Sequence, residues 1–178
     1  MVKFKFWQAG EDYFKTRKNI WVKFSAPAIA MTIYAVVMFL LDVKQGVILA
    51  DVFKDFVNVQ ISAIAILISF SIAIMTILIT ADNKNIAKIK ETLSKGCKPL
   101  NGNPMSLFQV LLSNITYTIL VEVIYLVILV TFIFVQLFVD DLVLKILMGV
   151  SIFFIIHILY ILLETVGQMY LTFWKNNE

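Results

Sequence analysis

Two sets of polar residues are spaced three or four positions apart inside long apolar runs, so each set would share one face of a helix. They are Asn114, Thr118 and Glu122 in one run, and His157, Tyr160 and Glu164 in another. Ionisable groups within a membrane commonly mark ion or proton paths. A relay through His157 and Glu164 is therefore one interpretation. The other is structural: the carboxyl groups would only hydrogen-bond or pair with neighbouring helices.

Distance from the acidic turn at residues 140–141 predicts the depth of these groups. Glu122 precedes that turn by 18 residues, and Glu164 follows it by 23. At about 1.5 Å per helical residue, both are expected near the far edge of a hydrocarbon core about 30 Å thick, with His157 deeper. The cost of burying a charge is lower at the edge than at the centre. This favours a neutral His157 and a structural role for the two carboxyl groups. They would hydrogen-bond across the third and fourth spans, or bond to Lys23 or to a lysine of the middle loop.

Other chemistry-bearing residues are too few for common catalytic or metal sites. The sequence has one cysteine, Cys97, and one histidine, His157, which cannot supply a disulfide framework or a four-ligand zinc site. It contains no glycine-rich phosphate loop, nucleophile elbow or zinc-protease motif. We therefore predict that the protein is not an enzyme and has no cofactor or metal. Cys97 is expected to be a reduced thiol, with palmitoylation as the alternative.

The composition requires a membrane around these residues. Of 178 residues, 61% are hydrophobic and 15% charged, far from the balance of soluble domains. Four apolar runs, at residues 24–41, 57–80, 111–139 and 142–163, are each near or above the length that crosses a bilayer. The runs are continuously apolar rather than alternating, which excludes a β-barrel. The predicted fold is all-α, a four-helix transmembrane bundle forming a single membrane domain over residues 1–178.

The distribution of basic residues predicts the orientation. Twelve of the fifteen Lys and Arg residues lie before the first run, between the second and third, or after the fourth. The positive-inside rule then places both termini in the cytoplasm, together with a helical hairpin at residues 81–110 and a tail at residues 164–178. We expect a multi-pass protein of the cytoplasmic (inner) membrane. Charged and aromatic residues precede the first run, so no cleaved signal peptide is expected.

Two segments outside the spans have amphipathic patterns. Trp7, Phe14 and Trp21 recur at intervals of seven, which predicts an interfacial helix at residues 1–23 with its aromatic rings at headgroup depth. The alternative is a helix docked on a partner or a neighbouring subunit. In the middle loop, Ile86, Ile89 and Leu93 predict a second amphipathic helix. Its lysines, which include Lys84, Lys88 and Lys95, would face solvent, anionic lipid or an acidic partner.

Small residues form a stripe along the second run. The stripe consists of Ser62, Ala65, Ser69, Ala73 and Thr76, at steps of three and four. Small residues let helix backbones approach closely in lipid, so the stripe predicts a helix-packing seam. The alternative is a pore lining.

The overall layout resembles that of small four-span proteins in prokaryotic defence loci. The resemblance is carried by four spans with a cytoplasmic N-terminus, the aromatic and basic first segment, and residues 68–83. The membrane subunit of the Kiwa anti-phage system is similar in plan, as are multi-span accessory proteins encoded beside RNA-guided ribonucleases. The resemblance implies a homo-oligomeric membrane platform that recruits a cytosolic partner acting on nucleic acid, or an effector that perturbs the membrane. It implies no functional residue.

The predicted function is therefore a non-enzymatic, oligomeric membrane platform or effector in anti-phage defence. It would contact lipid and a cytosolic protein, without binding nucleic acid itself. The alternative is a small ion or proton channel that uses the polar residues of the third and fourth spans. A multidrug-type exchanger is disfavoured, because residues 24–41 contain no carboxylate.

Overall fold

The computed structural model describes residues 5–41, 46–81, 84–94, 97–99 and 102–174. These residues form six helices and no strand, so the all-α prediction is confirmed. The helices are α1 (Lys5–Thr16), α2 (Ile20–Leu40), α3 (Leu49–Thr80), α4 (Lys84–Glu91), α5 (Leu107–Val135) and α6 (Asp141–Trp174). Four of them, α2, α3, α5 and α6, are long and apolar enough to cross a membrane.

The long helices extend beyond some of the predicted spans. Helix α3 begins at Leu49 rather than at residue 57, directly after a turn in which Gly46 has a φ of 85°. Its first turns are held by burial of Leu49 and Phe53. Helix α5 begins at Leu107 because Ser106 and Gln109 form a reciprocal capping box. Helix α6 continues without a break into the segment that was expected to be a tail.

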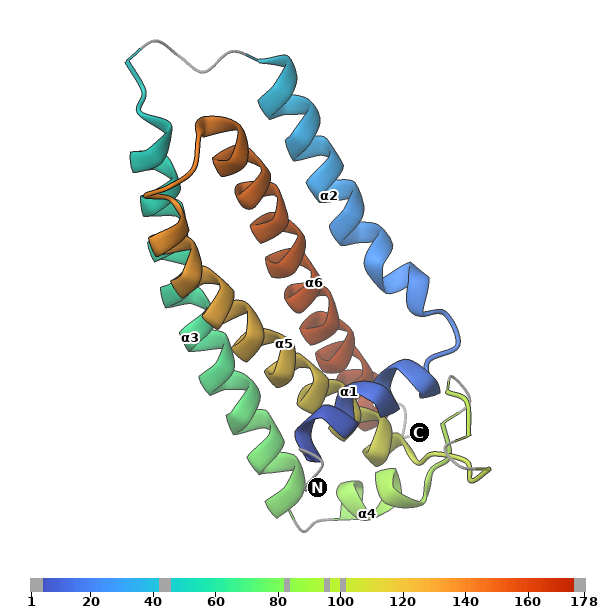
Figure 1. Cartoon of the computed structure of the whole chain (residues 1–178). Helices are drawn as coiled ribbons and strands as arrows, with labels where there is room; N and C mark the ends of the chain where they lie inside the picture. The colour runs from blue at the N-terminus through green and yellow to red at the C-terminus, as the bar shows by residue number, and fades with distance from the viewer. Residues whose placement is uncertain (1–4, 42–45, 82–83, 95–96, 100–101, 175–178) are drawn as a thin grey trace.

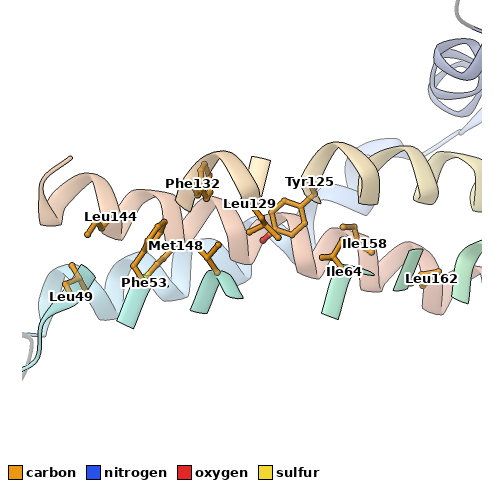
Figure 2. Packing of buried hydrophobic residues seen from close by; sticks show 11 residues of the cluster. Leu49, Phe53, Ile64, Tyr125, Leu129, Phe132, Leu144, Met148, Ile158 and Leu162 are labelled. Carbon is orange, nitrogen blue, oxygen red and sulfur yellow. The ribbon is translucent and has the colours of Figure 1, made fainter. Parts of the chain in front are cut away.

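Helix α5 is packed between α3 and α6, while α2 lies on the outer side of α6 (Figure 1). The main core joins side chains from α3, α5 and α6 (Figure 2). Its buried members are Leu49, Phe53, Val57, Ile64, Tyr125, Leu129, Phe132, Leu144, Met148, Ile158 and Leu162. This core fixes the three helices against one another and so fixes the polar residues that they carry.

Helix α2 packs along α6. The ring of Tyr34 lies beside Gly149, where an added Cβ would be 3.4 Å from the ring. The Tyr34 hydroxyl donates to the carbonyl oxygen of Lys145 at 3.2 Å, and Lys145 Nζ donates to the carbonyl oxygen of Met38 at 3.2 Å. Most of the remaining α2 surface is exposed, including Ile29 and Ile33.

Helices α1 and α4 lie at one end of the bundle, where the last turns of α6 also lie (Figure 1). Helix α4 packs Ile86 and Ile89 onto a core cluster with Leu78 and Leu111. The segment between α3 and α5 thus packs on the end of α5 through α4. Leu93 was expected on the apolar face of this helix, but it follows α4 and is 57% exposed, because the helix ends at Glu91 and Leu93 pairs with Ser106 instead.

The predicted continuous helix carrying three aromatic residues is wrong. Helix α1 ends at Thr16, so Trp21 lies in α2, where it is 84% exposed. Phe14 packs against Tyr117 of α5, with ring centroids 5.6 Å apart. Trp7 falls within α1, but its side chain lies outside the described part of the chain. Helix α1 therefore docks on the protein, as in the alternative interpretation, although here the surface is its own α5.

Candidate functional site

A chain of hydrogen bonds connects two cations through α5 and α6 at the end that α1 covers. Arg17 donates to Asn114 Oδ1, and Asn114 Nδ2 donates to Gln168 Oε1 at 3.3 Å. Gln168 Nε2 donates to Glu164 Oε1 at 3.0 Å, and Lys23 forms an ion pair with the other oxygen of Glu164. We call these five residues the polar network. Of the partners expected for Glu122 and Glu164, the structure brings Lys23 to Glu164.

Local structure explains why these five residues meet. Glu164 and Gln168 are four positions apart on α6 and so share a face. Lys23 lies in the first turn of α2. Arg17 sits in the break between α1 and α2, where Arg17 and Cys97 form an isolated β-bridge and Lys98 N donates to Thr16 O at 2.7 Å.

Arg17 is almost fully buried, with 6% of its surface exposed. Its Nη1 donates to Cys97 Sγ at 2.9 Å, its Nη2 also donates to the carbonyl oxygen of Val110 at 3.3 Å, and its guanidinium carbon lies 5.0 Å from the centre of the Tyr13 ring. All of these contacts are with neutral groups. Arg17 Nε is buried and has no hydrogen-bond partner among the described residues.

A pocket of about 500 Å³ opens beside the polar network. Arg17, Lys23, Glu164 and Gln168 line it, together with the exposed Lys18 and with uncharged residues of the middle segment and α5. Its lining contains three cations and one carboxylate, so the pocket is suited to an anion.

An aromatic cluster lies next to this network. Tyr13 stacks on Tyr117, and the Tyr117 hydroxyl is 3.1 Å from His157 Nε2. The His157 ring also stacks on Phe24, with centroids 4.7 Å apart. Burial raises the pKa of Tyr13 above its ordinary value, because its phenol is shielded from water. The cluster therefore packs α1, α2, α5 and α6 against one another through aromatic side chains.

The predicted relay between His157 and Glu164 is not formed among the described residues. His157 contacts Tyr117 and the aromatic rings, whereas Glu164 is committed to Lys23 and Gln168. Tyr160, the third member of that predicted set, is partly buried and packs against the cluster around Tyr13. His157 and Tyr160 thus belong to the aromatic cluster, whereas Glu164 belongs to the ion pair with Lys23.

Glu122 lies deeper than the polar network and apart from Glu164. It is eight residues from Asn114 on α5, or about 12 Å along the helix. It is fully buried, and its Oε1 accepts a hydrogen bond from Ser71 of α3 at 3.1 Å. Its Oε2 has no partner among the described residues. Thr118, one turn away, bonds the carbonyl oxygen of Asn114 in its own helix. The predicted polar residues of the third and fourth spans are therefore divided among three places: the polar network, the aromatic cluster and the Glu122 site.

Another polar contact ties the three core helices together. The Tyr125 hydroxyl of α5 donates to Gln60 Oε1 of α3 and lies 3.1 Å from the carbonyl oxygen of Ser151 in α6. Sequence reasoning did not single out Gln60, Ser71 or Arg17. A signal existed for two of them, because Gln60 and its near neighbour Asn58 are the only two amides within residues 57–80, and Arg17 is the only arginine in the chain.

The small-residue stripe faces outward. Ser62, Ala65, Ser69, Ala73 and Thr76 are all exposed, on the side of α3 opposite the residues buried against α5 and α6. No other described helix packs on the stripe, because larger residues such as Phe53 and Ile64 occupy the inner face of α3. The predicted packing seam is therefore not formed among the described residues of one chain. The hydroxyls of the stripe bond carbonyls of α3 itself, as Ser69 does with Ala65 at 3.0 Å, which makes the face compatible with lipid or with another helix.

Two of the three predicted lipid- or partner-contact lysines lie on the outer face of α4. Lys84 and Lys88 are both exposed there, opposite the buried Ile86 and Ile89. Lys95 lies outside the described residues. Within the described part of the chain, no three His, Cys, Asp or Glu residues gather closely enough to hold a metal ion.

The four long apolar helices define a multi-pass membrane protein of the all-helical class. No protein-family model, no curated protein and no solved structure matches the chain.

Proposed function

We propose that the protein is a non-enzymatic membrane platform that assembles with copies of itself and holds a cytosolic protein partner. Both termini and the end covered by α1 and α4 would lie on the cytoplasmic side of the cell membrane, as the positive-inside rule predicts. Antiviral defence is the proposed setting, and it rests on the resemblance in layout described above.

The observation that carries this proposal is the outward stripe of α3. Helices in lipid gain little from hydrophobic burial and associate where small residues let backbones approach. The stripe, from Ser62 to Thr76, offers such a face, and the other described residues leave it uncovered. Its own hydroxyls are already hydrogen-bonded within α3, so a second copy could pack there without burying unpaired groups. We therefore assign this face to contact between copies of the chain.

The partner is assigned to the covered end for a separate reason. Helix α4 buries only its two isoleucines and presents a basic outer face with Lys84 and Lys88. A fixed basic face on a membrane-anchored end favours recruitment of an acidic protein surface, because complementary charge speeds encounter.

Cysteine cross-linking in native membranes tests the assembly. In a Cys97→Ser background, Ala73→Cys places a thiol on the stripe, and the control Val127→Cys places one on an exposed part of α5, where Val127 is 62% exposed. Oxidation is expected to give covalent dimers for Ala73→Cys but not for Val127→Cys. Adding Ser69→Phe to Ala73→Cys should abolish the dimer by preventing close approach. A monomer alone for Ala73→Cys would contradict the proposal.

A small ion or proton channel is the second candidate, and Glu122 favours it. A fully buried carboxyl group with one unpartnered oxygen in an apolar helix is the kind of group that carries ions through membranes. The test is flux into liposomes containing the purified protein, compared with protein carrying Glu122→Gln and Glu164→Gln together. A channel using these groups should lose most of its flux, whereas equal flux in both samples would eliminate this candidate.

A further inference from the structure

The charges of the polar network do not balance. Arg17 and Lys23 are cations, and Glu164 is the only carboxylate in the network, where it pairs with Lys23 and accepts from Gln168. Arg17 is left with a thiol, a carbonyl, an amide and an aromatic ring as its contacts. A buried charge without a counter-charge is strongly unfavourable. The structure therefore contains a buried guanidinium that lacks an anion among the described residues.

The space for that anion adjoins Arg17. The pocket of about 500 Å³ is lined by Arg17 and Lys23 and bordered by the exposed Lys18. Cys97 Sγ, which accepts from Arg17 Nη1, is a weak acceptor. A phosphate oxygen would be a stronger acceptor for the same N–H group, and a guanidinium can bind two oxygens of one phosphate at once.

The position of the pocket matches the depth of a phosphate layer. It lies where α2 begins, at the break between α1 and α2, and beside the C-terminal half of α6. Charged side chains at the end of a spanning helix sit at the headgroup level of a bilayer. A pocket of this volume is large enough for a phosphate with its attached polar group.

We propose that this pocket binds a phosphate group, held by Arg17 and Lys18, that belongs to an anionic phospholipid headgroup or to free phosphate. Arg17 provides a charge-assisted N–H contact through Nη1, and Lys18 provides charge at the entrance. Lys23 remains paired with Glu164. This site is independent of the contact between copies on α3.

The experiment measures ligand binding and thermal stability of the full-length protein in a neutral detergent. The probes are dioctanoyl phosphatidylglycerol, inorganic phosphate and dioctanoylglycerol, which has the same chains as the first probe but no phosphate. Wild-type protein is expected to bind at least one phosphate probe and to show a higher Tm with it, and to show neither effect with dioctanoylglycerol. Binding of the lipid alone identifies a headgroup, whereas comparable binding of inorganic phosphate identifies a free phosphate compound.

Three variants connect the binding to the pocket. Arg17→Gln keeps a donor near Asn114 but removes the charge, and is expected to weaken binding about tenfold or more. Lys18→Gln, at an exposed position, is expected to weaken it about two- to fivefold without affecting folding. Lys84→Gln removes the same charge from α4, outside the pocket lining, and should change nothing.

Several results would overturn the proposal. They are an absence of binding of both phosphate probes to wild-type protein, equal binding of dioctanoylglycerol, or unchanged binding in Arg17→Gln. If Arg17→Gln does not fold, Lys18→Gln decides in its place, and binding that equals that of Lys84→Gln would reject the site.

Discussion

Tyr13 of α1 lies flat against Tyr117 of α5, with ring centroids 3.9 Å apart and ring planes 1° apart. The Arg17 guanidinium lies over the same Tyr13 ring. Tyr13 is fully buried, so α1 shares the interior of the bundle rather than resting on its surface. This contact connects the first helix to the polar network and to the pocket beside it.

We expect Tyr13→Phe to be neutral or to stabilise the protein by up to about 1 kcal/mol. The Tyr13 hydroxyl is buried without a hydrogen-bond partner among the described residues, and removing an unsatisfied buried group relieves a desolvation cost. Tyr13→Ala should instead cost about 3–5 kcal/mol, because it deletes a packed ring. Unfolding in mixed detergent micelles measures both changes. A loss of more than about 1 kcal/mol in Tyr13→Phe would reveal a hydroxyl contact that contradicts this assignment.

The same residue predicts an alkaline loss of stability. Burial raises the pKa of Tyr13 in the folded protein, whereas an unfolded tyrosine ionises near pH 10. Below about pH 10 the phenol is neutral in both states and has no effect. Above it, ionisation favours the unfolded chain, so this part of the stability declines as the pH rises towards the folded pKa. The free energy of unfolding of Tyr13→Phe should therefore fall less between pH 9 and pH 11 than that of wild type.

Gly10 is expected to be required for the docking of α1. An added Cβ at Gly10 would lie 3.3 Å from Leu120 Cδ2, so Gly10→Ile should push α1 away from α5 and destabilise the protein by about 1–3 kcal/mol. Gly167 of α6 is the matched control, because nothing lies within 4 Å of its added Cβ. Gly167→Ala should stabilise by about 0.5–1 kcal/mol through helix propensity. Limited proteolysis after α1 reports the first effect, and equal resistance of Gly10→Ile and wild type would contradict it.

The ion pair between Lys23 and Glu164 should couple α2 to α6. Its side chains are only partly exposed, at 11% and 26%, so removing one partner leaves a poorly solvated charge. We expect Lys23→Met and Glu164→Gln to be non-additive, with a coupling of about 1–3 kcal/mol in a double-mutant cycle. Lys15 and Glu11 form an exposed pair, at 65% and 55%, and provide the control. The corresponding cycle there should give less than about 1 kcal/mol, and equal couplings in the two cycles would contradict the prediction.

The sequence predicted the four spans because hydropathy depends on composition and not on tertiary contacts. It also named Lys23 among the expected partners of Glu122 and Glu164, and the structure pairs Lys23 with Glu164. The inward face of α3 could not be predicted in this way. Every face of that run is apolar, so spacing located the small residues but gave no information on which side α5 would pack.

The site was only partly predictable for a related reason. Asn114, Glu122, His157 and Glu164 were identified because polar groups are rare in apolar runs. How they divide into separate clusters depends on Arg17, which reaches Asn114 from 97 residues away along the chain. Such a contact leaves no periodic pattern in the sequence. It follows from how the segment before α2 folds back over α5.

The attachment of α2 to α6 has a consequence for biosynthesis. The first long helix to leave the ribosome finds its main packing partner in the last one to be made. Before α6 has emerged, the Tyr34 ring of α2 lacks its contact with Gly149. Helices α3 and α5, by contrast, can already pack against each other. Completion of the bundle is therefore a post-translational event, and a chain that stops before α6 would leave its earliest span without its main packing partner.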